Sequence, residues 1–316
     1  MDGQTYAEGE IIEVVADASY SSGDIIQVRD GRAGVIRGNY ISGDTMSVEV
    51  TRGLILTCPK TLTMVLLDGG SGYWDFSANK VHFAHGGDRD FFLGSIVGDC
   101  ASAATTCKVA LNVHPEYAVS LEHGWNTIPV LTADIINGAV GVGKEGVCHT
   151  FGAVAEAGKN DALSMRSFSN ASLAIVEARI TVVDGGDNAA LDYNLGLADA
   201  THATDADSIA VSAFMHLNGT DVNIYFESDD GTTEVAATDS TVNYAAGTAF
   251  EVWWDLRDIA DIQIYVDGVN VLPSSVFKLN AAAAATLKLL SHMEKTSDNT
   301  TADIVVHFLR ARLAQI

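Results

Sequence analysis

Basic residues and proline are scarce in this 316-residue sequence. It has 18 lysines and arginines against 41 acidic residues, a formal net charge of −23, and only 4 prolines. A chain with this net negative charge is repelled by phosphate backbones and by anionic lipid. Neither a nucleic-acid partner nor a membrane partner is therefore expected. No apolar run approaches the roughly 18 residues of a transmembrane helix. The acidic, polar first ten residues do not have the pattern of a secretory signal.

Cysteine is also rare, and its spacing excludes the common metal and redox motifs. The four cysteines, Cys58, Cys100, Cys107 and Cys148, form no C-x-x-C pair, so no zinc ribbon or thioredoxin-type motif is present. Cys58 and Cys107 stand in apolar, strand-like surroundings, where small buried thiols are common. We expect all four to be reduced, in a protein made in a cytoplasm.

One short stretch imitates a phosphate-binding loop. In "NGAVGVGKEG" (137–146), Gly138, Gly143 and Lys144 fit the frame G-x-x-x-x-G-K, and Asp184 ends the apolar run "ITVVD". A working loop needs a Ser or Thr hydroxyl for Mg²⁺ where Glu145 stands, and it must open a helix. The following "GVCHTFGAV" is typical of strand or loop. We therefore interpret the stretch as a connector leading into a strand, with no nucleotide and no other cofactor.

What the sequence has is alternating apolar residues punctuated by its 29 glycines, which predicts an all-β chain. Short apolar runs about ten residues apart predict a small sandwich or barrel over residues 1–115. In it, Met46 to Thr51 alternates as a half-buried strand does. Residues 116–146 are predicted to be a connector, and a linker, an interface segment or a first strand of the next domain would each fit this segment.

Longer strands predict an antiparallel jelly-roll sandwich over residues 147–316. Val222, Ile224 and Phe226 are expected on one face of a strand. Ile262, Ile264 and Val266 are expected on one face of another, which ends in a hairpin turn at 267–268. The segment "NAAAAATLKLL" is ambiguous, because five alanines favour helix locally.

The first part of the chain resembles a known family. The stretches "AEGEIIEVVADASYSSGDIIQVRDGRAGVI", "ISGDTMSVEVTRGLILTCPK", "DGGSGYWDFSANKV" and "FFLGSIVGDCASAATTCKVALN" follow one another in the order and spacing of the tailed-phage capsid decoration, or cement, proteins. The resemblance covers residues 7–113. It implies a structural, non-enzymatic protein that binds the outside of the phage head at junctions of the major capsid protein, often as a homotrimer. Residues 1–6 would then be an arm reaching a neighbouring subunit.

The second part resembles the concanavalin-like (laminin-G-like) sandwich. The resemblance rests on "FEVWWDLRDIADIQIYVDGVNV" and the closing "VVHFLRARL". It implies a projecting adhesive or structural domain without naming a ligand.

Four aromatic residues are candidate ligand contacts. Tyr73 and Trp74 could form a sugar-stacking platform, although core and turn positions suit them better. Trp253 and Trp254 are neighbours on a predicted strand, so they face opposite sides. One is expected in the core and the other at a surface, an edge or a partner contact.

Oxygen- and nitrogen-bearing side chains offer weaker metal candidates, and no metal is predicted. Asp184, Asp187 and Asn188 in "VDGGDN", with Asp205 and Asp207 in "TDADS", have Ca²⁺-type oxygens but no EF-hand frame. Solvated acidic loops explain them better. His82 and His85 lie three apart, but a zinc site would need further ligands.

The sequence therefore predicts a phage head decoration protein with no catalytic residues, located on the outer surface of the virion capsid. Residues 1–115 would bind the capsid, and residues 147–316 would project outward. The alternative is a carbohydrate-binding adhesion module on the virion, with host surface glycans as partners. A second alternative is a glycoside hydrolase, which would need two carboxylates about 5–10 Å apart in a cleft.

Overall fold

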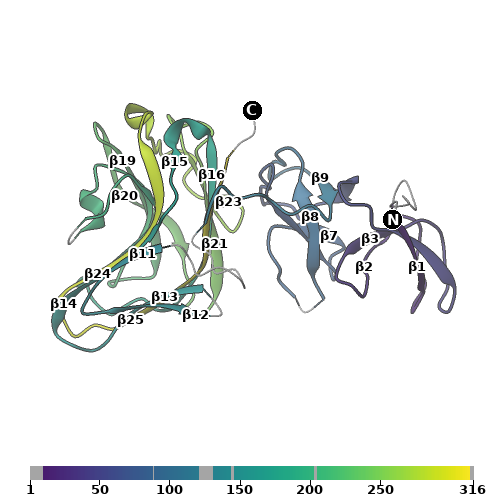
Figure 1. Cartoon of the computed structure of the whole chain (residues 1–316), viewed down its shortest axis with the longest axis horizontal. Coiled ribbons are helices and arrows are strands. Elements are labelled where there is room, and N and C mark those ends of the chain that lie inside the picture. The colour runs from purple at the N-terminus through teal and green to yellow at the C-terminus, as the bar shows by residue number, and fades with distance from the viewer. Residues whose placement is uncertain (1–9, 88, 121–130, 144–145, 203–204, 314–316) are drawn as a thin grey trace, which may run out of the picture. The chain divides into compact units, whose positions relative to one another are not determined.

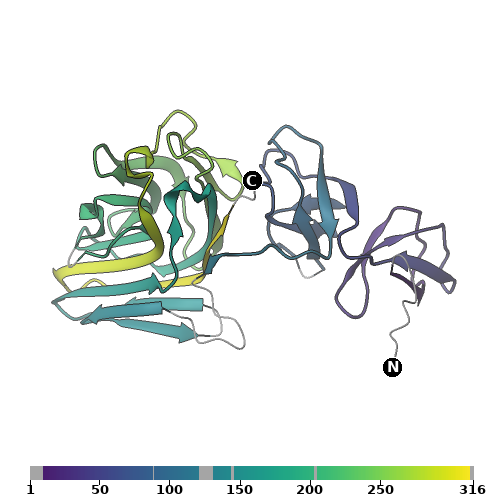
Figure 2. The same ribbon diagram turned by 45° about the horizontal axis from the view of Figure 1, so that its top comes forward.

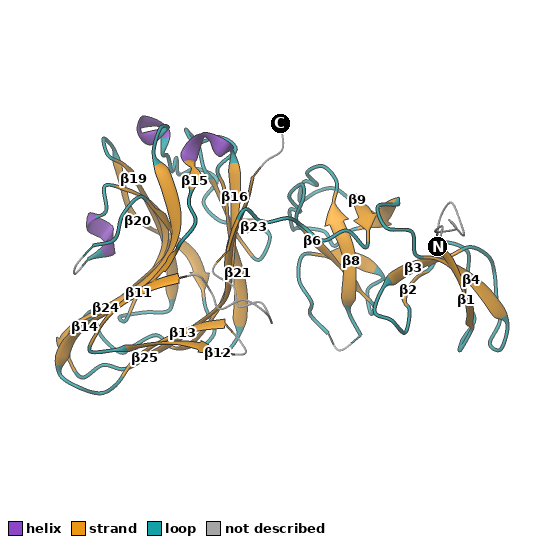
Figure 3. Ribbon diagram, in the orientation of Figure 1, coloured by secondary structure: helices purple, strands orange, loops and turns teal. Residues whose placement is uncertain are grey.

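The computed structural model describes residues 10–87, 89–120, 131–143, 146–202 and 205–313 (Figure 1). The chain divides into two compact units, residues 1–116 and 117–316. The predicted boundary at residue 115 lies one residue from this division. Strands dominate both units, as predicted, and the described helices are three short 3-10 turns, Asn170–Ser172, Ala206–Ser208 and Asn280–Ala282 (Figure 3).

Unit 1 consists of two antiparallel sheets. The first has the order β1-β4-β3-β2 and the second the order β5-β9-β8-β6-β7. The strands of the first sheet are β1 (Ile11–Val15), β2 (Ile25–Gln27), β3 (Ala33–Ile36) and β4 (Thr45–Glu49). Those of the second are β5 (Ile55–Pro59), β6 (Ser71–Asp75), β7 (Lys80–His82), β8 (Phe91–Ile96) and β9 (Thr106–Leu111).

Each sheet of unit 1 has its own apolar face. The alternation predicted from Met46 onward is confirmed through β4, where Met46 and Val48 are buried, although the strand ends at Glu49. Asn112 ties the two sheets together, because its amide donates to the carbonyls of Ala33 (3.0 Å) and Val50 (3.1 Å). It also accepts from the Ala33 N–H at 2.9 Å. This side chain satisfies backbone groups that no strand pairs.

Unit 2 is an antiparallel sandwich of two large sheets lying face to face (Figure 2). We call the sheet with the order β12-β13-β25-β16-β21-β22-β23 the front sheet; β10 also pairs with β25. Its strands are β10 (Val119–Ser120), β12 (Ala139–Gly143), β13 (Gly146–Phe151), β16 (Ala174–Asp184), β21 (Ala249–Asp255), β22 (Gln263–Val266), β23 (Val269–Asn270) and β25 (Ala302–Leu313).

The other sheet of unit 2, here the site sheet, has the order β11-β14-β24-β17-β18-β19-β20, and β15 also pairs with β24. Its strands are β11 (Leu131–Ile136), β14 (Glu156–Ser164), β15 (Phe168–Ser169), β17 (Leu191–Ala198), β18 (Val211–Asn218), β19 (Asn223–Asp230), β20 (Glu234–Asn243) and β24 (Thr286–Asp298). The all-β sandwich predicted for this part of the chain is confirmed.

Alternate residues of both sheets meet in one core. Trp254 and Phe226, from opposite sheets, are fully buried with ring centroids 6.3 Å apart. Ile262, Ile264 and Val266 are all buried, as predicted from their period of two. The remaining core members include Ile180, Val182, Tyr193, Leu195, Met215, Ile224, Leu289, Met293, Ile304, Val306 and Leu309.

Turn chemistry sets the hairpins. Asp267 and Gly268 have φ of 48° and 76°, the left-handed pair of a two-residue hairpin, which confirms the predicted turn between β22 and β23. Val222 is 44% exposed, contrary to its predicted place on the buried face. The reason is that β19 begins one residue later, so Val222 belongs to the preceding turn.

The predicted connector, 116–146, is wrong as a separate element. β10 pairs with β25, β11 with β14, and β12 with β13, so the described parts of this segment are strands of unit 2. The glycine-rich local sequence does not favour strands, but distant strands of the two sheets supply hydrogen-bond partners, and local sequence cannot indicate this pairing. The alanine-rich segment forms one 3-10 turn before β24. No helix among the described residues is long and apolar enough to cross a membrane.

Candidate functional site on the outer face of the site sheet

A row of polar side chains crosses the outer face of the site sheet. Asp161 is in register with His292, His292 with Asn194, Asn194 with His216, and His216 with Tyr225. Strand alternation explains the row, because the neighbouring residues in these strands point into the core. A sheet face open to water also carries polar residues, but four of these five are buried, and only Tyr225 is half-buried.

A loop covers part of this face and accounts for the burial. Ala206 and Ile209, from the loop between β17 and β18, pack on Phe214 and Leu290 of the sheet in a small apolar cluster. The loop is stiffened by Asp205, whose carboxylate accepts hydrogen bonds from the Asp207 N–H and the Ser208 hydroxyl, both at 3.0 Å. This cap orients Asp207 toward the polar row.

At the β14 side of the row, one imidazole lies between two carboxylates. His292 is fully buried, with Nδ1 against Asp161 and Nε2 2.8 Å from the Glu294 carboxylate. Burial acts to lower the pKa of His292, but the hydrogen bonds to Asp161 and Glu294 outweigh it and raise that pKa to about 9. Lys159 Nζ lies 3.1 Å from the second oxygen of Asp161. This half of the row is therefore a charged, internally paired network.

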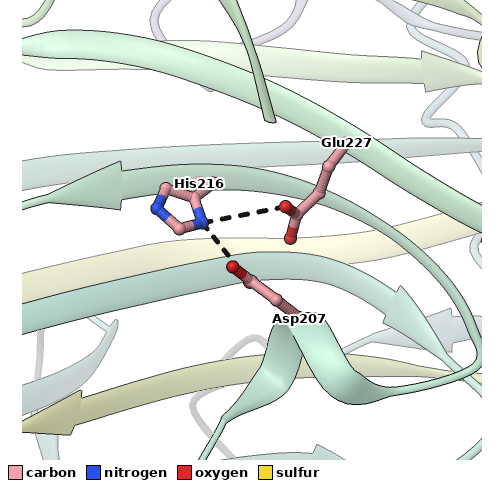
Figure 4. Close-up of side chains that lie close together, drawn as sticks. All are labelled: Asp207, His216 and Glu227. Atoms are coloured by element: carbon pink, nitrogen blue, oxygen red, sulfur yellow. Dashed lines mark ion pairs between the residues drawn. The ribbon is translucent and has the colours of Figure 1, made fainter. Parts of the chain in front are cut away.

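At the β19 side, a second imidazole meets two carboxylates (Figure 4). His216 Nδ1 lies 3.4 Å from Asp207 Oδ1 and 3.8 Å from Glu227 Oε2. Asn194 Nδ2 lies beneath them, 2.7 Å from Asp207 Oδ1, 2.9 Å from Glu227 Oε1 and 3.3 Å from His216 Nδ1. On the other edge of the ring, His216 Nε2 faces Asp192 Oδ1 at 3.5 Å.

The environment separates the protonation states of these groups. Burial and the neighbouring charge of Asp207 raise the pKa of Glu227 to about 8. Burial also acts to raise the pKa of Asp207, but contact with His216 outweighs it and lowers that pKa to about 2. Burial acts to lower the pKa of His216, but the adjacent carboxylates of Asp192 and Asp207 outweigh it and raise that pKa to about 10. Perturbed pKa values are common both at functional sites and in buried structural ion-pair networks, so the geometry of the cluster has to distinguish the two.

This cluster is the group among the described residues whose His, Cys, Asp and Glu atoms converge as metal ligands do. One ligand atom from each of Asp207, His216 and Glu227 lies within 4.8 Å of the others. The two carboxyls are therefore closer together than those of a retaining glycosidase, which lie about 5–5.5 Å apart.

Sequence reasoning identified only one member of this cluster. Asp207 was a Ca²⁺ candidate together with Asp184, but Asp184 caps a different loop, where it accepts from Gly186 N at 3.0 Å and Thr301 Oγ1 at 2.6 Å. The residues weighed as Ca²⁺ candidates therefore lie in two separate places. His216 and Glu227 were missed. Glu227 stands at an outward position of the strand predicted around Ile224 and Phe226, whereas no strand was predicted around His216.

The four candidate aromatic residues do not form an exposed platform. Trp253 and Trp254 face opposite sides of β21, as predicted, but they are 6% and 0% exposed. Trp253 packs on Tyr265 and donates to Glu251 at 3.3 Å. Trp253, the tryptophan on the outer face of the sheet, is therefore covered and offers no exposed ring to a ligand. The physical reason is that the Tyr265 ring and the Glu251 side chain of the same sheet contact it.

Trp74 and Tyr73 belong to the interior of unit 1, as their core interpretation predicts. Trp74 is 4% exposed. Tyr73 is half-buried and makes edge contacts with Phe92 and His85, at centroid distances of 5.7 and 6.5 Å. His82, predicted to be no zinc ligand, instead places Nδ1 3.2 Å from the carbonyl of Ala84.

The imitation phosphate loop is a hairpin. β12 and β13 pair antiparallel from Ala139 with Thr150 to Gly143 with Gly146, and the chain continues as strand. Lys144 and Glu145 lie outside the described residues. Without a helix after the glycines, the helix N-terminus that holds phosphate in such loops is missing here.

Comparisons with known proteins concern the fold alone. No family model matches the chain, and no curated protein matches it. Solved structures do match. A carbohydrate-binding module, CBM66, from Bacillus subtilis is 16% identical, with a TM-score of 0.37 over 58% of this chain and 95% of its own.

Two further solved structures belong to the same group of matches. The Emp47p carbohydrate recognition domain is 10% identical, with a TM-score of 0.44 over 62% of this chain and 95% of its own. The catalytic domain of an endo-1,3-beta-glucanase from Thermotoga petrophila is 11% identical, with a TM-score of 0.36 over 50% and 69%. At these values the likeness assigns no function to this chain. The predicted relation of residues 7–113 to capsid decoration proteins stays a prediction.

Proposed function

We propose that unit 2 binds carbohydrate at the outer face of the site sheet, beside the loop that carries Asp207. The observation that supports this most directly is the polar row itself. It sets planar carboxylate, amide and imidazole groups at fixed positions, and burial and hydrogen bonds keep their rotamers in place. Binding sites for small polar ligands are built from a few such preorganised groups.

The accessible part of the face has the features that a sugar requires. Asp192 and Asp207 have 37% and 43% of their side chains exposed and offer acceptors for hydroxyl pairs. Tyr225 lies at the end of the row, half-buried, with its ring edge-to-face on His216 at 6.3 Å and its hydroxyl on Asp221. Such a ring presents an apolar face to a sugar and a polar edge to water.

The charge of the face selects among glycans. Asp192, Asp207 and Glu294 stand on the accessible side, and the whole chain carries a net charge of −23. A sulfated or uronic-acid glycan would be repelled by this field, whereas a neutral glycan or an amino sugar would not. The proposed ligand is therefore a neutral or amino-sugar glycan.

The test is a glycan array with the purified full chain, followed by calorimetry on the best ligand. Tyr225→Ala should weaken binding at least tenfold, and Tyr225→Phe, which keeps the ring, should weaken it much less. Asp192→Asn should also reduce affinity. As a matched control, Asp261→Asn makes the same charge change at an exposed site elsewhere and should have no effect. Absence of any neutral or amino-sugar ligand, or binding that is indifferent to Tyr225→Ala, contradicts the proposal.

A second proposal concerns unit 1 and is supported by exposed apolar side chains. Ile11 and Val15, on the edge strand β1, are 57% and 67% exposed, and Ile41 and Ile55 are 67% and 58% exposed. Unpaired edges with apolar residues are sites for another chain. We propose that this unit attaches the protein to the phage capsid shell, as a non-enzymatic decoration protein acting as a homotrimer on the virion surface.

Capsid attachment is tested by co-sedimentation with expanded shells stripped of the protein. Saturable pelleting at a fixed ratio to the major capsid protein is expected. Ile11→Lys combined with Val15→Lys should reduce pelleting, because it places charge on the apolar edge strand. The variant should fold, because both side chains are exposed and the core is unchanged. A folded protein that stays in the supernatant would refute this role and leave the glycan proposal standing.

A further inference from the structure

The cluster formed by Asp207, His216 and Glu227 has the geometry of a metal site. A tetrahedral Zn²⁺ with bonds of about 2.0–2.2 Å holds its ligand atoms about 3.3–3.6 Å apart. The distances from His216 Nδ1 to the two carboxylates, 3.4 and 3.8 Å, are close to this spacing. They are long for N–H···O hydrogen bonds, whose usual distance is 2.9–3.0 Å.

The hydrogen-bond donors and acceptors of this cluster are imperfectly matched. The Asn194 amide nitrogen has two hydrogens but faces three acceptors, at 2.7, 2.9 and 3.3 Å. If His216 Nδ1 carries a proton, that proton meets the Asn194 donor; if it does not, its lone pair faces two carboxylates. One contact is unfavourable in either state, and a cation among the three ligand atoms would relieve both.

The second contacts of the ligands suit a metal site. Asp192 stands against His216 Nε2 at 3.5 Å, on the edge of the ring away from the cluster. A carboxylate at the remote nitrogen keeps the proton there and turns the other lone pair toward the metal, which is the usual support of a metal-binding histidine. Asn194 likewise orients one oxygen of Asp207 and one of Glu227.

Access and ligand type narrow the choice of ion. Asp207 is 43% exposed, whereas Glu227 and His216 have 10% and 9% of their side chains exposed, so an ion can enter past Asp207. Imidazole with two carboxylates suits a divalent transition metal, and Ca²⁺ prefers oxygen ligands only. Three protein ligands leave one coordination position open toward solvent.

We propose that Asp207, His216 and Glu227 bind one divalent transition-metal ion of the zinc class. This ion would fasten the loop between β17 and β18 to strands β18 and β19. The proposal does not depend on carbohydrate binding, since all three ligands and their supports are contacts within unit 2.

The experiment is equilibrium dialysis and calorimetry of the chelator-stripped full chain with Zn²⁺. One ion per chain is expected, with a rise in the thermal midpoint of unfolding. Asp207→Asn should weaken binding at least tenfold, and because Asp207 is on an exposed loop this variant should fold. Glu227→Gln and His216→Gln should abolish stoichiometric binding, and Asp261→Asn should bind as the parent does.

Co²⁺ substitution separates this site from the four free cysteines. The proposed ligands give d–d bands without a thiolate charge-transfer band. A thiolate band, no stoichiometric Zn²⁺, or Zn²⁺ binding that Asp207→Asn leaves unchanged would overturn the proposal. A parent chain that binds a glycan but no metal ion would refute the metal site alone. A parent chain that binds the metal ion but no glycan would refute only the proposed carbohydrate function.

Discussion

Replacing Glu177 by alanine tests whether the segment after residue 116 is part of the sandwich. Glu177 lies buried on the outer face of the front sheet, 6% exposed. It accepts hydrogen bonds from Arg312 Nε at 2.8 Å, Arg310 Nε at 3.3 Å and the Tyr117 hydroxyl at 3.0 Å. Tyr117 comes from the segment predicted as a connector, and the Arg310 guanidinium stacks on its ring at 4.1 Å.

The magnitude follows from what the substitution leaves behind. Glu177→Ala removes this carboxylate from the guanidinium of Arg312, whose side chain is only 8% exposed. Removing one partner of a buried ion pair costs about 3 to 5 kcal/mol of unfolding free energy. For a domain of this size each kcal/mol lowers the midpoint by about 2–4 °C, so a fall on the order of 10 °C is expected.

The assay is urea and thermal unfolding followed by circular dichroism, with two controls. Tyr117→Phe removes one hydrogen bond and should cost about 1 kcal/mol. Glu234→Ala, at an exposed position of β20, should stay within about 0.5 kcal/mol of the parent. A loss below about 1 kcal/mol for Glu177→Ala would refute the reasoning, as would a Tyr117→Phe variant indistinguishable from the parent.

The same variant gives a pH signature. Burial acts to raise the pKa of Glu177, but Arg312 and Arg310 outweigh it and hold that pKa below its ordinary value. A carboxyl with a lowered folded-state pKa stabilises the fold above the unfolded value, about 4.3, and this contribution is lost as the pH falls through the folded pKa. The stability difference between parent and Glu177→Ala should therefore shrink in acid.

Three further outcomes are expected. Because the pKa of His292 is raised to about 9, its protonated imidazole contributes its full stabilisation below pH ~6.5, and this contribution is lost as the pH rises to ~9. In His292→Asn, the unfolding free energy should therefore change less with pH between these two values. A pH dependence identical to that of the parent would argue against the paired imidazole. Lys295→Met removes a buried ammonium that donates to the carbonyls of Gly152, Val154 and Thr300, of which only the last is in a buried contact, and should cost at least about 1 kcal/mol in urea unfolding. In unit 1, Gly94→Ala would place a Cβ 2.0 Å from the carbonyl oxygen of Ala110, so its folded yield and midpoint should both fall; a parent-like midpoint would contradict this packing.

The sequence was most informative where local chemistry decides the structure. The period of two at Ile262, Ile264 and Val266 predicted a buried strand face, and Asp267 with Gly268 predicted its hairpin. These signals are local because alternation and left-handed turn residues are properties of a few consecutive residues. The strands within residues 116–146 were not predicted, because they depend on non-local pairing. β10 pairs with β25 and β11 pairs with β14, and both partners follow later in the chain.

By itself, the sequence determined an all-β chain, the strand faces and turns, and an acidic surface that disfavours polyanions. Only the tertiary structure decided the site. Asp207, His216, Glu227 and Asn194 come from four segments, and nothing in their spacing joins them. They converge because strand register and a capped loop place outward side chains side by side, and burial there changes their pKa values. Long-range strand pairing, which no local pattern encodes, brought these four side chains into contact.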